Sequence, residues 1–189
     1  MDKINLRNLY RYDSKTKTYY IDIQLEDYRD AYSDWDYSPF NNRDLDDDLT
    51  EYLLECSYEL NGRKNIIIVF HILHQKKNLL RENKSREGMY NYFQYKIRKL
   101  NNQRVRLIKN TLNFFLIGIV LLLLRYITEI NFQKSIITQL IEESFIIGGW
   151  VMIWEMFSTW FFNVKELSNN IKQYKKLKNI KIIFIYNEE

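Results

Sequence analysis

Two long apolar segments constrain the fold of this chain more than any other feature. Residues 110–124 carry no charged side chain, and residues 144–164 carry only Glu155. As α-helices these segments would extend about 22 Å and about 31 Å, and roughly 20 apolar residues cross the hydrocarbon of a bilayer. Arg125 can snorkel to the interface, which extends the first span. We therefore predict transmembrane helices at 109–127 and 144–164, joined by an external loop at 128–143.

A helical hairpin buried inside a soluble protein is the competing interpretation. It is disfavoured because residues 116–124 (LIGIVLLLL) are apolar on every side of a helix. The chain also has little other mass with which to cover two such helices. The membrane interpretation is therefore the one we carry forward.

Basic residues flank the outer ends of this hairpin and are nearly absent between its helices. Residues 165–176 contain four lysines, whereas the predicted loop contains only Lys134. Because positive residues favour the cytoplasmic side, both termini should be cytoplasmic. Five side chains before the first helix should contact anionic lipid headgroups: Arg98, Lys99, Arg104, Arg106 and Lys109.

Charge is segregated along the rest of the chain. Residues 1–60 carry 7 basic and 15 acidic side chains, whereas residues 61–127 carry 14 basic and 2 acidic ones. Aromatic residues interleave with the basic segment 81–109, as they do in some proteins that bind single-stranded nucleic acid. A basic helix next to a membrane segment more simply meets lipid, so a nucleic-acid partner is disfavoured.

The remaining sequence predicts a small α/β domain built from both ends of the chain. Residues 19–25 alternate as a half-buried strand, 46–60 form an amphipathic helix, and 65–73 form a buried strand. A helix from about Glu87 should continue into the first span as one rod. Residues 165–178 predict a basic helix, and 180–186 predict a final strand of the same sheet. The fold class is thus α+β: a two-helix transmembrane hairpin with a cytoplasmic α/β domain at 1–108 and 165–189.

Glu155 is the most informative single residue in the apolar segments. A carboxylate at membrane depth is costly, so it should face protein or water, or be protonated. Three uses remain open: an ion or proton pathway, a polar contact between subunits, and a packing contact, the last being favoured. We expect Asn113 as its intrachain partner, and Glu142 or Glu143 as the partner of Arg125. The predicted polar and packing positions are Glu155, Asn113, Gly118, Gly148, Gly149 and Thr159, and the interface anchors are Arg125, Trp150, Trp154 and Trp160.

Other chemistry-bearing residues favour structural roles. His71 and His74 are three apart, which on a strand places them on opposite faces, so a metal site is disfavoured. The acidic run at 44–48 lacks the spacing of a calcium loop and suits a helix N-terminus. The single cysteine, Cys56, should be a buried hydrophobe. The sequence predicts no catalytic, cofactor-binding or metal-ligating residues.

Three segments together resemble a family of small bacterial membrane proteins. They are 37–40 (YSPF) with 43–45 (RDL), 92–95 (YFQY) leading into the first span, and 148–155 (GGWVMIWE). The Gly-Gly-Trp signature is the most specific of these. The chain departs from the family pattern after Trp154, where it has no proline. The resemblance implies two spans, a short C-terminal strand and a bacterial inner membrane location, and it implies no residue roles.

These observations favour a non-enzymatic membrane protein that acts by assembly. The cytoplasmic domain would receive a signal or partner, and the hairpin would form homo-oligomers and alter the membrane as an effector or channel-like element. Small two-span bacterial proteins are often effectors in stress or phage defence, an expectation by analogy. The alternative is a membrane anchor or scaffold that recruits a cytoplasmic protein. An enzyme is the weakest interpretation, because no catalytic motif is visible.

Overall fold

A four-stranded sheet organises one of the two units into which the chain divides. The structure, a computed structural model, describes residues 6–39, 41–63, 65–73 and 76–186. The sheet unit takes Met1–Arg98 and Lys172–Glu189, and the hairpin unit takes Lys99–Ile171. The α+β class predicted from the sequence is therefore confirmed, with a small sheet and two long apolar helices.

The strands are β1 (Arg11–Asp13), β2 (Thr18–Leu25), β3 (Asn65–Ile72) and β4 (Lys181–Tyr186), in that spatial order. β1 pairs antiparallel with β2, while β2, β3 and β4 run parallel. The predicted strands at 19–25, 65–73 and 180–186 are confirmed, including the return of the last strand to the same sheet. β1 was not predicted, because three residues are too few to show an alternating pattern.

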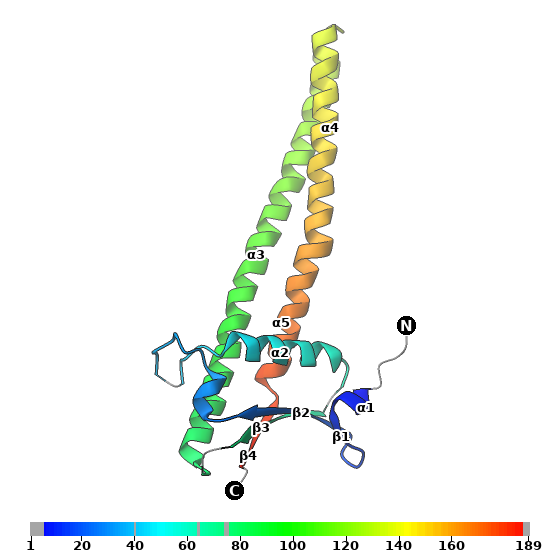
Figure 1. Ribbon diagram of the computed structural model, residues 1–189. Helices are drawn as coiled ribbons and strands as arrows, with labels where there is room; N and C mark the ends of the chain where they lie inside the picture. The colour runs from blue at the N-terminus through cyan, green and yellow to red at the C-terminus, as the bar shows by residue number, and fades with distance from the viewer. Residues whose placement is uncertain (1–5, 40, 64, 74–75, 187–189) are drawn as a thin grey trace. The chain divides into compact units, whose positions relative to one another are not determined.

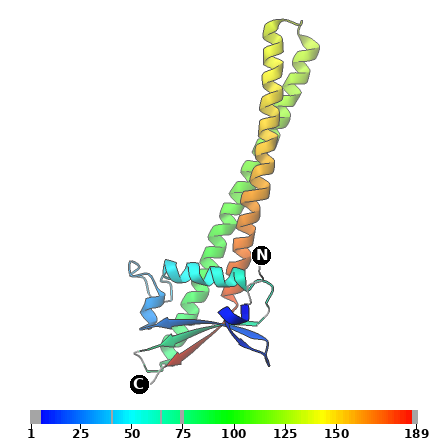
Figure 2. The same ribbon diagram turned by 45° about the vertical axis from the view of Figure 1, so that its right-hand side comes forward.

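Three helical segments accompany the first strands: α1 (Leu6–Leu9), the 3-10 turn η1 (Tyr28–Ala31) and α2 (Asp47–Glu59). α2 matches the predicted helix. The side chain of Asp46 accepts a hydrogen bond from the backbone N–H of Leu49, so it caps one of the unpaired donors at the helix start. Gly62, with φ of +82°, reverses the chain after the helix, a conformation that glycine adopts without strain. Figure 1 and Figure 2 show α2 lying along one face of the sheet.

One uninterrupted helix, α3 (Leu79–Asn131), runs for 53 residues from the sheet unit into the hairpin. The prediction of a single rod is confirmed, but the helix begins earlier than Glu87. Asn78 explains the start, because its side-chain oxygen accepts hydrogen bonds from the N–H groups of Leu80 and Arg81.

The return path consists of α4 (Ile136–Ser158), the π-helical segment η2 (Thr159–Val164) and α5 (Lys165–Lys178). The prediction of a loop over the whole of 128–143 was wrong: α3 extends to Asn131 and α4 begins at Ile136. Ser135 fixes the new start, since its side chain and that of Thr138 form a reciprocal capping box. Figure 2 shows the tight turn that joins the two helices.

The core of the sheet unit lies on the face of the sheet that bears Ile21, Ile68 and Phe70, all of them fully buried. Strand register carries this face to Phe184 of β4, whose ring stacks near that of Phe70 with centroids 5.6 Å apart. α2 contributes Leu53 and Cys56, which confirms the buried placement of the single cysteine. The core thus joins residues from both ends of the chain.

The opposite face of the sheet is more open. Asp22 and Ile185 are exposed there, and Ile67, His71 and Ile183 are half-buried. The carboxylate of Asp22 lies 2.7 Å from the guanidinium of Arg11 and 2.9 Å from Nε2 of His71. This face therefore carries a mixture of apolar and charged groups.

Replacing Ile68 by Ala should destabilise the sheet unit by about 2–5 kcal/mol, because the removed methyl groups leave a cavity in a close-packed core. Hydrogen exchange of the β3 amides in the full chain measures this loss of protection. Ile185→Ala, on the open face of the neighbouring strand, should cost less than half as much. Equal effects of the two substitutions would contradict the assignment of the core face.

Candidate functional site

The two hairpin helices approach each other closely at a pair of glycines, Gly118 and Gly149. A Cβ on Gly118 would lie 3.0 Å from the carbonyl oxygen of Gly149, and a Cβ on Gly149 would lie 2.8 Å from Leu122. Gly148, by contrast, faces only a terminal methyl of Leu121 at 3.3 Å. Small residues let helix backbones approach in this way, which favours association in lipid. Gly118 and Gly149 therefore lie in the contact between the two helices, and Gly148 lies at its edge.

The two polar positions predicted on the second apolar segment, Glu155 and Thr159, lie in different environments. Thr159 is buried in the helix contact, whereas Glu155 is exposed on the helix surface. Thr159 donates a long hydrogen bond to a carboxylate oxygen of Glu155, at 3.4 Å. Asn113 is also exposed, and among the described residues no hydrogen bond joins it to Glu155. The expected pairing of Glu155 with Asn113 was therefore wrong. The carboxylate instead accepts its hydrogen bond from Thr159, one turn further along the same helical segment.

The glycine contact also fixes the level of Glu155 along the hairpin. Glu155 lies six residues beyond Gly149, about 9 Å along the helix, which places it opposite the part of α3 near Leu112. This level is close to the boundary between the basic and the apolar parts of α3. Glu155 therefore lies toward one end of the apolar hairpin and not at its centre.

Arg125 finds a partner on its own helix. Its guanidinium lies 2.7 Å from the carboxylate of Glu129, one turn along α3. The expected partners, Glu142 and Glu143, assumed that the helix ended near 127, and that expectation was wrong. Because Arg125 and Glu129 offset each other, the stretch of α3 without an unpaired charge extends from Asn110 to Asn131, about 33 Å.

Apolar side chains cover the outside of the hairpin. Each helix has an apolar stretch of 18 residues. Only 11% of that stretch is buried in α3, and only 6% of it is buried in the continuous helix from Ile136 to Lys178. Both helices are long and apolar enough to cross a membrane. The predicted anchors Trp150, Trp154 and Trp160 are exposed by 61%, 75% and 48%. A helix in the core of a soluble protein would be mostly buried, so these surfaces need another apolar environment.

The predicted headgroup residues stand on α3 just before its apolar part. Arg104 is half-buried. The other four are exposed: Arg98, Lys99, Arg106 and Lys109. The helix contact sets the aromatic end of the return helix, from Trp154 to Phe162, against this basic part of α3. Aromatic and basic side chains gather at the interfacial level of membranes. Contact with lipid remains a prediction for these residues.

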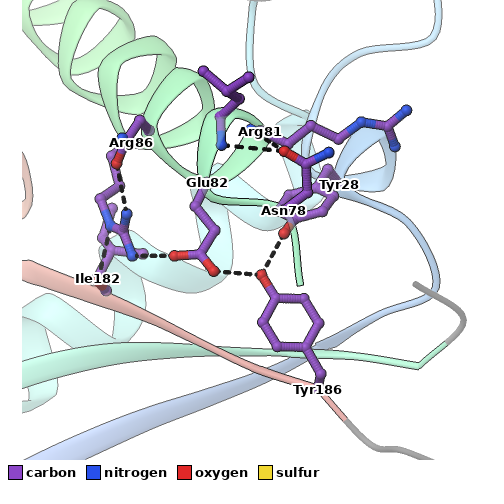
Figure 3. Close-up of polar contacts among 9 residues, drawn as sticks. Tyr28, Asn78, Arg81, Glu82, Arg86, Ile182 and Tyr186 are labelled. Carbon is purple, nitrogen blue, oxygen red and sulfur yellow. Dashed lines mark hydrogen bonds and ion pairs between the residues drawn. The ribbon is translucent and has the colours of Figure 1, made fainter. Parts of the chain in front are cut away.

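A polar network at one edge of the sheet was missed in the sequence. It centres on Glu82, which is 5% exposed in the first turn of α3. Tyr186, the last residue of β4, donates a hydrogen bond of 2.6 Å to Glu82, and Arg86 pairs with the same carboxylate at 2.8 Å. Tyr186 also hydrogen-bonds the hydroxyl of Tyr28, in η1. Figure 3 shows these side chains converging from three separate parts of the chain.

The electrostatics of this network depend on the charge of Glu82. Burial opposes its ionisation, but the hydrogen bonds from Tyr186 and Arg86 and the positive charge of Arg86 outweigh burial, so the pKa of Glu82 is lowered. Burial and the bond to the Glu82 carboxylate both raise the pKa of Tyr186. Arg86 also donates to the carbonyl oxygen of Ile182 and lies 5.0 Å from the ring of Phe184. The network therefore ties α3 to β4.

A sequence signal for this network did exist. Glu82 is one of only two acidic residues in the strongly basic segment 61–127, and Arg86 follows it at the spacing of one helical turn. The helix, however, was expected to begin after this pair. Because the predicted helix began after Arg86, the spacing of four residues between Glu82 and Arg86 did not indicate an ion pair on one helix face.

The remaining chemistry-bearing residues offer no metal centre in the part of the chain that the structure describes. No group of three or more His, Cys, Asp or Glu side chains there could hold a metal ion. His71 belongs to the open sheet face, while His74 lies outside the described residues, as does Phe40 of the YSPF segment. Burial raises the pKa of the Cys56 thiol, which disfavours a reactive thiolate.

Comparisons with family models, curated proteins and solved structures give no significant match to this chain. The resemblance to two-span bacterial membrane proteins therefore remains a prediction from the quoted motifs.

Gly118→Ala should weaken the hairpin by about 1–3 kcal/mol, since the added methyl group meets a backbone oxygen that cannot move aside. Gly148→Ala is the matched control, and should be neutral or slightly stabilising because alanine favours helix. Resistance of the two helices to unfolding in sodium dodecyl sulfate, followed by circular dichroism, measures both. Equal tolerance of the two substitutions would contradict the close crossing at Gly118.

Glu82→Gln should destabilise the sheet unit by about 1.5–3 kcal/mol at pH 7, because it removes the charge that Arg86 and Tyr186 contact. The folded-state pKa of Glu82 is lowered, so its stabilising effect is present above its unfolded pKa of about 4.3. That effect is lost as the pH falls through the folded pKa, and the two proteins should then converge. Urea titrations at pH 7, 5 and 3 measure this, with the exposed Glu87→Gln as control. A difference that does not change with pH would contradict the role of the charge.

Proposed function

We propose that this chain is a non-enzymatic membrane protein whose hairpin inserts in the bacterial inner membrane and assembles there under control of its cytoplasmic sheet unit. The observation that carries the proposal is the continuity of α3. Its first turn holds the buried Glu82, and the same helix continues without interruption into the apolar hairpin. A helix transmits a displacement or rotation along its axis because every residue is tied to the next turn.

The dimensions of the hairpin suit a membrane. The stretch from Asn110 to Asn131 is about 33 Å long as a helix, close to the hydrocarbon thickness of about 30 Å. The return helix presents aromatic side chains where α3 is basic, as expected at the headgroup level. The excess of lysine and arginine at this end favours cytoplasmic termini and an external turn.

Assembly is proposed at the surface that bears Glu155. The glycine face of each helix is already used within the chain, whereas Glu155 is exposed among apolar side chains such as Val151 and Trp154. A carboxyl group near the membrane boundary gains by hydrogen-bonding to protein, and polar side chains join helices in lipid for this reason. A second copy of this chain offers the same carboxyl group and the same apolar surroundings.

A membrane anchor that recruits a soluble protein is the second candidate. The open face of the sheet favours it, because Ile67, Ile183 and Ile185 lie there beside the charged cluster of Arg11, Asp22 and His71. Such a mixed surface is typical of sites where proteins associate reversibly. Co-purification of one soluble protein that is lost on Ile185→Asp supports the anchor.

The membrane proposal is tested by expression of the full chain in bacteria. Resistance to carbonate extraction, together with labelling of an external cysteine at Lys134→Cys in a Cys56→Ser background, is the expected result. Depolarisation of the inner membrane on expression supports the effector, and its absence at confirmed membrane levels favours the anchor. Release of the protein by carbonate would overturn insertion.

Glu155→Leu should reduce crosslinked oligomers at least several-fold, whereas Glu155→Gln should keep them, because the amide retains hydrogen bonding without charge. Glu143→Leu makes the same change at an exposed carboxylate near the other end of the helix and serves as control. Amine-reactive crosslinking of isolated membranes, followed by electrophoresis, measures all three. Unchanged oligomers in Glu155→Leu would contradict the proposed contact.

A further inference from the structure

A groove of about 860 Å³ runs along the return helix of the hairpin unit, across the π-helical segment η2. Its lining side chains form two rows, each with a spacing of four residues. One row consists of Trp154, Ser158, Phe162 and Glu166, and the other consists of Phe157, Phe161, Lys165 and Asn169. The volume is within the range of sites that hold small molecules.

The π-helical segment explains why both rows stay on one face. Along an α-helix, each step of four residues advances about 40° around the axis, so a row with this spacing winds onto another face. The hydrogen bonds of a π-helix join residues five apart, and its wider turn offsets that advance. Such segments frequently occur at functional sites. Ser158 is small and stands between Trp154 and Phe162 in its row, which deepens the groove.

The groove lies on the outer surface of the hairpin. Phe161 and Phe162 are exposed, whereas Thr159 and Val164 of the same π-helical segment are buried. The rings of Phe157 and Phe161 stack with their centroids 6.4 Å apart, and so form one apolar wall. The contact between the two hairpin helices therefore leaves the groove accessible from outside.

The groove changes from apolar to polar along its length. The part from Trp154 to Phe162 presents four aromatic rings and one hydroxyl group. The part from Lys165 to Asn169 presents one ammonium, one carboxylate and one amide group. Trp154 lies 11 residues, or about 16 Å, before Lys165 along the helix. An amphiphile with apolar chains and a compact polar head matches this order.

The polar end of the groove carries one charge of each sign. Lys165 and Glu166 stand on different rows, and neither takes part in an ion pair among the described residues. A phosphate group matches the ammonium of Lys165, and an ammonium group matches the carboxylate of Glu166. The side-chain oxygen of Asn169 can accept a further N–H bond. These charges match a zwitterionic head better than an anionic one.

We propose that this groove binds one phospholipid whose head carries a phosphate and a primary ammonium group, as in phosphatidylethanolamine. The acyl chains lie along the aromatic rings, the phosphate pairs with Lys165, and the ammonium pairs with Glu166. A primary ammonium group has three N–H donors, whereas the trimethylated ammonium of a choline head has none. An anionic glycerol head offers no cation to Glu166. The groove therefore distinguishes the ethanolamine head from both of the others.

This site rests on the proposed insertion of the hairpin, because the chain meets the acyl chains of phospholipids only within the bilayer. The contact of Gly118 with Gly149 sets Trp154 level with the start of the apolar part of α3, and Lys165 level with its basic part. Glu155 does not line the groove, so a lipid there does not need the carboxyl group proposed for assembly. Lipid binding and assembly can therefore be tested separately.

Binding is tested by quenching of tryptophan fluorescence in the full chain, with Trp35, Trp150 and Trp160 replaced by Phe so that Trp154 alone reports. The protein is reconstituted in vesicles of phosphatidylethanolamine, phosphatidylglycerol and phosphatidylcholine in equal amounts, with one of the three lipids brominated on its acyl chains at a time. We expect the brominated ethanolamine lipid to quench at least twofold more strongly than either of the others.

Three variants of this protein test the assigned charges. Glu166→Gln should shift the preference from the ethanolamine lipid to the anionic lipid, because Lys165 then has no carboxylate beside it. Lys165→Gln should weaken quenching by the ethanolamine lipid at least twofold. Lys172→Gln, which changes an exposed lysine of the same helix outside the groove, should leave the preference unchanged. Circular dichroism confirms that the variants are folded.

Equal quenching by the three lipids overturns the site and leaves insertion standing, as does a preference that Glu166→Gln does not change. Where quenching is equal, loss of crosslinked oligomers in Phe161→Ala/Phe162→Ala shows that a second copy of this chain fills the groove. The absence of quenching by every lipid, in protein that carbonate releases from membranes, overturns insertion together with the site. The effect of Glu155→Leu on oligomers is independent of these outcomes.

Discussion

The parallel pairing of β3 with β4 is the constraint on which the rest of the structure depends. The two strands are neighbours in the sheet, yet the whole hairpin lies between them in the sequence. Both ends of the hairpin must therefore return to the same sheet, and the α3 and α5 segments next to the strands supply core side chains such as Phe93 and Leu177. The apolar helices are in this way an insertion within a folded domain and not an appended tail.

The Glu82 network further joins the segments of the sheet unit. Its buried carboxylate links the last residue of β4, the start of α3 and the turn after β2, so three otherwise separate segments share one charge. A buried charge that keeps all its partners fixes geometry well, and one that loses a partner is costly. The start of α3 is consequently a place where a small change in local contacts has a large energetic effect.

Much of this fold could be predicted from the sequence, because hydrophobic periodicity is strong in it. The alternation at 19–25 and the apolar run at 65–73 predicted β2 and β3, and the uniform apolar run at 116–124 predicted the hairpin. The errors concern helix ends. Asn78 and Ser135 start helices through side-chain caps that are weak signals among many polar residues, and α3 therefore began earlier, and the turn was shorter, than expected.

Side-chain partners were harder to predict than helices. Arg125 was assigned across the turn, although Glu129 stands one turn away on a helix that the prediction had ended too soon. The choice between Gly148 and Gly149 as the contact residue required the rotation of one helix against the other, which spacing alone does not give. The residues of the Glu82 network come from segments more than 50 positions apart, and only the folded chain brings them together.

The order of strands has a consequence for biosynthesis. Because the chain is made from its N-terminus, β3 is complete while β4 is still to be synthesised, and the whole hairpin must emerge first. During that interval β3 presents an unpaired apolar edge, the kind of edge that invites pairing with other chains. Synthesis of the hairpin and closure of the sheet are thus successive steps of one process. Any delay in synthesis of the hairpin prolongs the interval in which the edge of β3 is unpaired.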